Sequence, residues 1–388
     1  MSADHLSGRQ RLLGLTAAIG CIATAAVALG VSFPLIALLL EQRGHSNLEI
    51  AISSAMAPIS IFLMSSQVPR LVNRFGLRTF VIICVVGDAL MMIALWLFQE
   101  YYIWLLIRFI MGGNVAGLFV ASETWINNLA EDRNRGRVMA IYNLSLSGGF
   151  ALGPGLLTLL GTDGAGPFLV SASIMLIAII PIIVAPVQSP RFPGKPAFSI
   201  FSYLKVAPTL AAALLLYALV EGGSSTFIPV YGRKIGLSDD LAVSGLVLFM
   251  IGAMALVFPI GWLSDRMNRR HLLYALVAVS AFGASLLPLV VANDLARSAL
   301  FFFMGGAIAS IFTIVMAMQG DRFKGADLIT ANAAFGVLYG IGSLVGQPLI
   351  GVSMDLLGPH GFGYALLANF AAFFAVAIYR HSSGKATN

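Results

Sequence analysis

Long stretches of apolar residues, separated by short polar segments, run along the whole chain. Each stretch has about 20 residues or more, the length that an α-helix needs to cross the roughly 30 Å hydrocarbon core of a bilayer. Twelve such helices are expected, at residues 12–40, 49–69, 79–98, 103–127, 138–160, 166–187, 207–231, 240–263, 271–292, 296–318, 328–352 and 360–379. The pattern predicts an all-α membrane protein with twelve transmembrane helices.

The last six helices repeat landmarks of the first six at a fixed distance along the chain. The tripeptide Met-Gly-Gly at 111–113 recurs at 304–306, an offset of 304 − 111 = 193 residues. Gly149 recurs as Gly342 at the same offset, 342 − 149 = 193. Weak internal symmetry of this kind is typical of membrane carriers built from two related halves.

The repeat predicts the domain organisation. We expect an N-terminal six-helix bundle at 1–188, a cytoplasmic linker at 189–205 and a C-terminal six-helix bundle at 206–388. Prolines are frequent in the first part of the linker, which disfavours a continuous helix there.

Composition and charge agree with a membrane location. Only 10% of the residues are charged and 59% are hydrophobic, whereas about a quarter of the residues of a soluble domain are charged. Eighteen Lys and Arg fall in the segments on the side of the amino terminus, and four fall in the opposite loops: Arg43, Arg233, Lys234 and Arg297. This bias predicts a multi-pass membrane protein with both termini in the cytoplasm. Topology then accounts for the net charge of +6, and no nucleic-acid partner is expected.

One polar loop carries a recognisable motif. The segment 261–270, GWLSDRMNRR, resembles the signature G-x-L-x-D-R-x-G-R-[RK] of the major facilitator superfamily, with Asn268 at the second glycine position. Its first-half copy at 69–78, PRLVNRFGLR, has proline for the leading glycine and Asn73 for the aspartate. The resemblance covers nearly the whole chain and implies two pseudo-symmetric six-helix bundles that work by alternating access. It implies gating roles for Asn73, Arg74, Gly76, Arg78, Gly261, Asp265, Arg266 and Arg269.

Asp265 has a physical reason to act as a latch in that loop. A carboxylate in a tight cytoplasmic loop can pair with Arg266 or Arg269, or can accept hydrogen bonds from a facing helix start. Asn73 carries no charge, so the first-half latch, also expected in a loop at 73–76, should be weaker. The alternative is a solvated loop that only enforces topology.

Shorter elements extend the resemblance. Arg108 and Gly112 match the family's R-x-x-x-G element, and the segment 149–154 is similar to the glycine-proline motif of antiporters. The segments 122–125 and 133–137 resemble the YcaD-like bacterial branch of the family, which implies a location in the bacterial inner membrane. Gly149, Gly153 and Gly155 also allow close helix packing, and Pro154 can bend its helix, so an antiport role and a packing role both remain open.

Ionisable groups inside helices are the candidate chemistry, because a charge in the hydrocarbon region is costly unless it is paired or faces water. Four are present: Asp88, Arg108, Glu123 and Glu221. Adding 193 places Ala281, Phe301 and Met316 opposite the first three. Packing shared by both halves does not require these charges. Their presence in the first half therefore favours a role in ion coupling or in substrate binding.

Glu221 is the best placed of them. Tyr217 and Ser225 lie one helical turn before and after it, which predicts an inward polar stripe. Arg108 and Glu123 share a helix face but lie about 22 Å apart along the axis, and a cross-cavity pair of Arg108 with Glu221 is left open. We expect proton coupling by residues among Glu221, Glu123 and Asp88, and substrate contacts from Arg108, Asn143, Tyr217, Glu221, Ser225 and Tyr339.

Two of these residues have structural alternatives. Glu123 can pair with Arg133 or Arg137 at the cytoplasmic interface. Asp88 lies on the third helix, which is peripheral in this superfamily, and a structural pairing is expected for it.

The functional expectation is a secondary active transporter of a small organic solute that works by alternating access and is driven by a proton gradient, with sodium as the alternative ion. The partial antiporter motif favours efflux, and proton-linked uptake is the alternative. A receptor or assembly protein of the same shape, without turnover, also remains open. The sequence has no G-x-x-x-x-G-K-[ST] motif, no histidine spacing for zinc and no Ser-His-Asp arrangement, so we expect no enzyme activity, cofactor or metal. A monomer in the lipid bilayer is expected.

Overall fold

The computed structural model describes residues 7–65, 67–129, 135–184, 206–323 and 325–382. Within these ranges, twelve helices are long and apolar enough to cross a membrane, and the prediction of twelve spanning helices is confirmed. The predicted linker at 189–205 lies outside the described residues.

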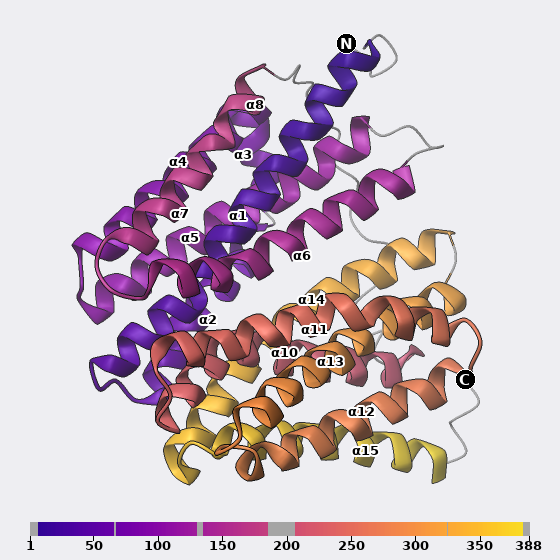
Figure 1. The fold of residues 1–388 in the computed structure, drawn as a ribbon. Helices are drawn as coiled ribbons and strands as arrows, with labels where there is room; N and C mark the ends of the chain where they lie inside the picture. The colour runs from indigo at the N-terminus through magenta and orange to yellow at the C-terminus, as the bar shows by residue number, and fades with distance from the viewer. Residues whose placement is uncertain (1–6, 66, 130–134, 185–205, 324, 383–388) are drawn as a thin grey trace. The chain divides into compact units, whose positions relative to one another are not determined.

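The helices of the first half are drawn in Figure 1 in indigo to magenta. Their bounds are α1 (Gly8–Gln42), α2 (Asn47–Ser65), α3 (Val68–Phe75), α4 (Leu77–Leu97), α5 (Tyr101–Leu129), α6 (Arg135–Leu160), α7 (Gly166–Ile177) and α8 (Ile179–Val184). The second half contains α10 (Pro208–Lys234), α11 (Asp239–Ser264), α12 (Arg269–Leu286), the short 3₁₀ helix η2 (Leu287–Leu289), α13 (Asp294–Arg322), α14 (Gly325–Leu357) and α15 (Gly361–Ser382).

The sixth span is interrupted, and proline explains where. It consists of α7 and α8, separated at Ala178. Pro181 has no backbone N–H, so it cannot donate to the carbonyl of Ile177 four residues earlier. The helix therefore breaks one residue after Ile177 and restarts.

The expectation of a loop at 73–76 is wrong. Asn73 and Arg74 lie in the short helix α3, and only Gly76 stands between α3 and α4. Val68 and Val72 are buried four residues apart, so α3 has an apolar face that stabilises it as a helix. Gly76 makes the turn with a φ of +78°, a conformation that glycine adopts without steric cost.

The chain divides into two compact units. Unit 1 comprises 1–39 and 56–194, and unit 2 comprises 40–55 and 195–388. The facing ends of α1 and α2 thus belong with the second half of the chain. In unit 2, α11 packs along α13 and α10 packs along α14 (Figure 1).

The repeated glycines mark the same helix crossing in each unit. A Cβ atom on Gly112 of α5 would overlap the carbonyl oxygen of Ala57 in α2, and one on Gly305 of α13 would overlap that of Phe249 in α11. The partner positions are also repeat-related, since 249 − 57 = 192. Glycine is required at both crossings because the backbones approach too closely for a side chain.

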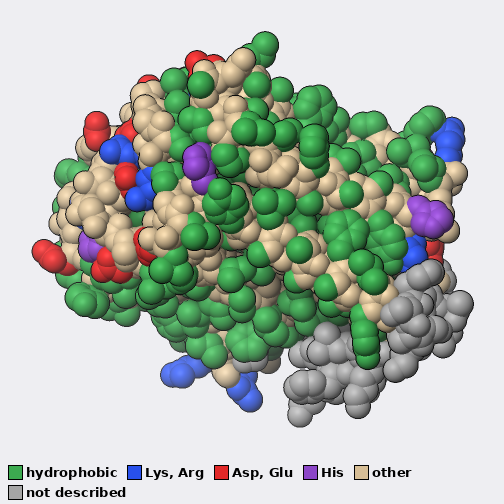
Figure 2. All heavy atoms as spheres, turned by 90° about the horizontal axis from the view of Figure 1, so that it is seen from below, with side chains coloured by type: hydrophobic (Ala, Val, Ile, Leu, Met, Phe, Trp, Pro, Cys, Tyr) green, Lys and Arg blue, Asp and Glu red, His purple; other side chains and the backbone are tan. Residues whose placement is uncertain are grey.

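The outer surface is apolar, as a bilayer requires. Leu159 is 83% exposed and Phe258 is 78% exposed, which would be unusual for large side chains facing water. Figure 2 shows a face dominated by hydrophobic side chains, with the charged side chains gathered toward the edges of the view.

Candidate functional site

Glu221 is the central residue of α10, and its carboxylate has one neutral partner. The hydroxyl of Tyr339, on α14, donates a hydrogen bond of 2.7 Å to Glu221 Oε2. The described residues provide no donor to the other oxygen, Oε1, and no ion pair to the carboxylate. The side chain is neither fully buried nor fully exposed, so one carboxylate oxygen remains available in the middle of a membrane-spanning helix.

Three aromatic rings form a cluster that reaches this carboxylate through Tyr339. The ring centroid of Tyr217, one turn before Glu221, lies 5.0 Å from that of Phe312 on α13 and 6.1 Å from that of Tyr339. Each ring is half-buried. Helices α10, α13 and α14 therefore bring together a cluster, here called the aromatic wall, that consists of Tyr217, Phe312 and Tyr339.

Polar side chains continue from the wall along the contact of α10 with α14. Ser343 Oγ donates to the carbonyl of Ala218 at 3.3 Å. The amide nitrogen of Gln347 lies 3.5 Å from the carbonyl oxygen of Gly222, a long contact, and its buried Oε1 has no hydrogen-bond partner among the described residues. Sequence reasoning missed Ser343 and Gln347. Their spacing of four and eight residues after Tyr339 was the signal that placed them on its helix face.

Ser225 does not present its hydroxyl to this site. Its Oγ donates to the carbonyl of Glu221 on the same helix at 3.1 Å, and the side chain is buried. Its predicted contact with substrate stays a prediction.

Arg108 is a buried cation in unit 1. The side chain is 2% exposed, and the described residues give its Nε and Nη1 no hydrogen-bond acceptor. Its guanidinium carbon lies 4.9 Å from the ring centre of Phe33 on α1, which provides a cation–π contact. A buried charge without a counter-ion is costly, so the position is suited to an anionic partner.

The other predicted residues lie in different settings. Asn114 of α5 donates to the buried carboxylate of Asp88 on α4 at 3.1 Å, a pairing with a neutral amide. Glu123 and Asn143 are exposed. The side chains of Arg133 and Arg137, the proposed partners of Glu123, lie outside the described residues.

The predicted latch loop of the second half holds an ion-pair network. Arg269 pairs with Asp265 at 3.0 Å and also with Asp321 of α13. Arg266 instead lies over the ring of Trp262, 3.5 Å from its centroid. Asn268, at the second glycine position of the motif, caps α12 by accepting from the backbone N–H groups of residues 270 and 271, which is a common use of asparagine.

The network borders a cavity of about 430 Å³. Its lining consists of Ala207, Thr209, Leu210, Asn268, Arg269, Arg270, Met318, Asp321 and Arg322. In the first half, Asn73 and Arg74 are exposed on α3. The Arg74 guanidinium lies 5.5 Å from the ring centre of Phe75, so the charged contacts of the two copies differ.

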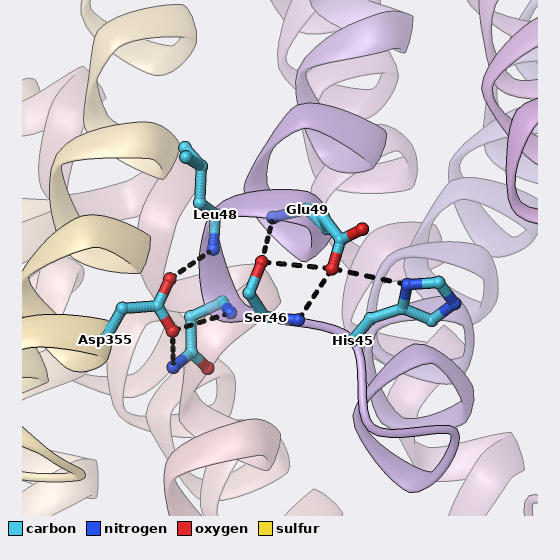
Figure 3. A network of polar contacts seen from close by, with 6 residues as sticks. His45, Ser46, Leu48, Glu49 and Asp355 are labelled. Atoms are coloured by element: carbon cyan, nitrogen blue, oxygen red, sulfur yellow. Dashed lines mark hydrogen bonds and ion pairs between the residues drawn. The ribbon is translucent and has the colours of Figure 1, made fainter.

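A second polar network, which the sequence did not reveal, ties α2 to α14 inside unit 2 (Figure 3). One oxygen of Asp355 accepts from the backbone N–H of Asn47 at 2.9 Å and from its side-chain amide at 2.7 Å, and the other accepts from the N–H of Leu48 at 2.9 Å. Ser46 and Glu49 form a capping box, in which Ser46 Oγ accepts from the N–H of Glu49 and Glu49 Oε2 accepts from that of Ser46. The first three amides of α2 are thus all satisfied.

The turn between α1 and α2, here called the hairpin tip, has another anchor in unit 2. Arg233 pairs with Glu41 at 2.7 Å and with Asp239 at 2.6 Å. Asp239 also accepts from the side-chain amide of Gln42 at 2.8 Å. Charged contacts therefore hold both sides of the turn at 43–46.

Comparison with known proteins agrees with this architecture. The family model described as Major Facilitator Superfamily matches residues 18–292 and 241–387. YfkF of Bacillus subtilis, described as an uncharacterized MFS-type transporter, is 27% identical over 335 residues and covers 82% of each chain. YcaD of Escherichia coli O7:K1, with the same description, is 24% identical over 257 residues and covers 66% of each chain. The expected likeness to the YcaD-like branch is confirmed.

Solved structures show the same fold at low sequence identity. A bacterial homolog to the human lysosomal transporter Spinster, in an inward-facing and occupied conformation, has a TM-score of 0.80 at 12% identity and covers 98% of each chain. The nucleoside transporter NupG has a TM-score of 0.77 at 12% identity and covers 97% of this chain and 99% of its own.

Proposed function

The chain belongs to the major facilitator superfamily and is a multi-pass secondary transporter, and from this premise we propose that protons drive its transport cycle through Glu221. In this proposal the protein exports a small organic solute from the bacterial cytoplasm, with both termini on the cytoplasmic side. Glu221 takes up and releases the proton during each cycle.

The observation that carries the proposal is the setting of the Glu221 carboxylate. It lies at the centre of α10, with a neutral hydroxyl donor on one oxygen and no described donor on the other. A permanently charged carboxylate in the hydrocarbon region would be costly without a counter-ion. A carboxylate that alternates between its protonated and ionised forms can instead link a proton to each change of conformation.

Asp88 and Glu123 are less suited to this role. The carboxylate of Asp88 is buried between α4 and α5, where Asn114 donates to it. Glu123 is exposed near the end of α5. The Ser122–Tyr142 pair lies near Glu123, but among the described residues neither Asp88 nor Glu123 has a hydrogen bond from a tyrosine as Glu221 has.

The direction of transport rests on the antiporter-like segment at 149–154. Cβ atoms on Gly149 and Gly153 would overlap backbone atoms of α1, whereas one on Gly155 would meet open space. Close packing is therefore sufficient to explain the first two glycines. Efflux follows from the resemblance alone, and the orientation follows from the positive-inside bias.

Arg108 favours a second candidate, proton-linked uptake of an organic anion. Its buried guanidinium has two nitrogens without described acceptors, and a carboxylate or phosphate group on the solute would supply them. The two candidates differ in the charge of the solute and in the direction of net flux.

A substrate screen in proteoliposomes tests the proposal. Purified protein is reconstituted, and a panel of radiolabelled cationic, anionic and neutral organic solutes is offered under an imposed proton or sodium gradient. We expect a proton gradient to drive uphill movement of at least one solute in the direction opposite to the protons. A sodium-driven flux would contradict proton coupling, and an absence of flux for every solute would favour a receptor or assembly role.

The matched variants Glu221→Gln and Glu123→Gln assign the proton carrier. Glutamine keeps the size of glutamate and one acceptor oxygen but cannot exchange a proton at neutral pH. Glu221→Gln should abolish uphill transport and retain exchange of labelled for unlabelled solute, whereas Glu123→Gln should retain both. Unchanged uphill transport in Glu221→Gln would remove Glu221 as the carrier and favour Glu123.

A further inference from the structure

The side chains around Glu221 carry negative electrostatic potential. The aromatic wall is built from three different helices, with ring-centroid separations of 5.0 and 6.1 Å around Tyr217. Aromatic faces carry negative electrostatic potential and attract cations, most strongly where water is excluded. The carboxylate of Glu221, one turn from Tyr217 and hydrogen-bonded to Tyr339, adds a negative charge at the edge of the wall whenever it is ionised.

The hydrogen-bonding groups at this place are unbalanced toward acceptors. Glu221 Oε1 has no described donor, and the buried Oε1 of Gln347, two turns along α14 from Tyr339, has no described partner. The hydroxyl of Tyr339 is already committed to Glu221. A ligand that brings positive charge or N–H donors would satisfy these oxygens, whereas an anion would be repelled by the ionised Glu221 carboxylate.

We propose that this site binds an organic cation, such as an amine in its protonated form or a quaternary ammonium or phosphonium ion, between the Glu221 carboxylate and the aromatic wall. The inference rests on the proposed function, because it assumes that the cluster lies on the transport route. It adds the chemical class of the solute to that proposal.

A coupling mechanism follows from this placement. Glu221 holds either a proton or the cation, so binding of one displaces the other, and the conformation that faces the more acidic side releases the cation. Among the described residues of unit 2, the ionisable groups beside Glu221 are Tyr217, one turn earlier on its own helix, and Tyr339 on α14, which donates to it. Phe312 of α13, which packs on Tyr217, and Asn369 of α15, which donates to the carbonyl of Leu216, do not ionise. The carboxylate is therefore the group in this cluster whose charge the proton and the cation share.

A pair of probes with the same shape and opposite charge tests the inference. Tetraphenylphosphonium is a cation and tetraphenylborate is an anion of nearly equal size, so their difference in binding isolates the charge. Saturable binding of each radiolabelled probe to the full-length protein in detergent is measured by equilibrium dialysis. We expect tetraphenylphosphonium to bind more tightly, and its affinity to fall as the pH is lowered.

Three variants relate this binding to the site. Glu221→Gln should lower the affinity for tetraphenylphosphonium at least tenfold. Phe312→Leu, which keeps an apolar side chain but removes the ring, should lower it at least threefold. Phe303→Leu is the matched control, because Phe303 is on the same helix and 58% exposed, and it should not change the affinity. The thermal unfolding midpoint of each variant shows whether it remains folded.

Tighter binding of tetraphenylborate, or unchanged binding of tetraphenylphosphonium to folded Glu221→Gln, would overturn the cation inference. Loss of tetraphenylborate binding in Arg108→Gln would then identify Arg108 as the charged group that selects the solute. Neither result would affect proton coupling, which is measured by uphill transport of whichever solute moves. Conversely, uphill transport that survives in Glu221→Gln would refute the proposed function while leaving the binding results intact.

Discussion

The contact between Asp355 and the start of α2 yields the sharpest prediction. Asp355→Ala removes the acceptor for the backbone amides of Asn47 and Leu48 and for the Asn47 side chain. It also removes a negative charge from the positive end of a helix dipole. Because the three bonds join segments 307 and 308 residues apart, their loss should loosen the hairpin tip from α14.

The size of the effect can be worked out from the contacts. Removing the acceptor at a helix N-terminus costs about 0.5–2 kcal/mol, and the dipole interaction is worth about 0.3–1 kcal/mol at exposed positions. Asp355 is exposed, so water replaces part of each lost bond, and the combined loss should be about 1–2 kcal/mol. That corresponds to roughly a 5- to 30-fold increase in the population with the tip released, since about 1.4 kcal/mol is tenfold.

Hydrogen–deuterium exchange of the reconstituted protein, followed by mass spectrometry of peptides that cover 40–55, measures this population. Asp355→Ala should speed exchange in these peptides by roughly that factor, and Asp355→Asn, which keeps one acceptor oxygen, should lie in between. Ser46→Ala is the matched control, because it removes the local cap of the Glu49 amide but leaves the bonds to α14. It should speed exchange at Glu49 alone.

Two outcomes would refute the reasoning about Asp355. Unchanged exchange at Asn47 and Leu48 in Asp355→Ala would mean that the three bonds do not hold the tip. Faster exchange over the whole chain would mean that the variant is globally unstable. The ion pairs of Arg233 with Glu41 and Asp239 remain in every variant, so complete detachment of the tip is not expected.

Three further predictions concern packing, gating and charge. Gly149→Ala should lower the free energy of unfolding by about 1–3 kcal/mol, because its Cβ would overlap the carbonyl oxygen of Ala23 in α1. Gly148→Ala is the control and should not lower it, because Gly148 has open space around it. Thermal unfolding midpoints in detergent compare the two variants, and equal midpoints would contradict the close packing of Gly149 on α1. Asp265→Asn should shift the equilibrium of the cytoplasmic gate toward the inward-open state by less than about 1 kcal/mol, because the carboxylate that pairs with Arg269 is largely exposed. Distances between paired spin labels across the gate measure the two populations. A shift of several kcal/mol would show that the aspartate has a stronger partner than Arg269. Arg108→Met should leave the thermal unfolding midpoint unchanged or raised, since removing a buried charge without a counter-ion is often neutral or stabilising, and a clear decrease would reveal a structural partner for the guanidinium.

The architecture was predictable because the bilayer imposes simple rules on the sequence. Helix length follows from membrane thickness, and the offset of 193 residues follows from the repeated glycines. The reason for those glycines is a close backbone crossing at repeat-related positions, Gly112 in one unit and Gly305 in the other. The exception was α3, where eight residues are too few to distinguish a short amphipathic helix from a loop by pattern alone.

The sequence identified individual residues of the candidate site but not the contacts between them. Polarity inside an apolar helix marked Glu221 and Tyr339 separately, but their hydrogen bond joins positions 118 residues apart. Phe312 carried no signal, because an aromatic residue in a membrane helix most often faces lipid or packs against a neighbour. Its role depends on the packing of α13 against α10.

Asp355 was missed for a related reason. A single acidic residue near the end of a helix is common at a membrane interface, and its sequence neighbours do not show what it binds. The capping box at Ser46 and Glu49 follows the local S-x-x-E pattern, whereas the bonds from Asp355 to the same helix start depend on tertiary structure.

Proton movement on addition of solute tests the central claim most directly. Proteoliposomes are loaded with a pH-sensitive dye and left without any imposed gradient, and a solute that the wild-type protein transports is added outside. The account predicts a dye response in the wild-type protein, of the sign expected for exchange of solute against protons, and none in Glu221→Gln, even though labelled solute still exchanges across the membrane in that variant. An undiminished proton signal in Glu221→Gln would contradict it.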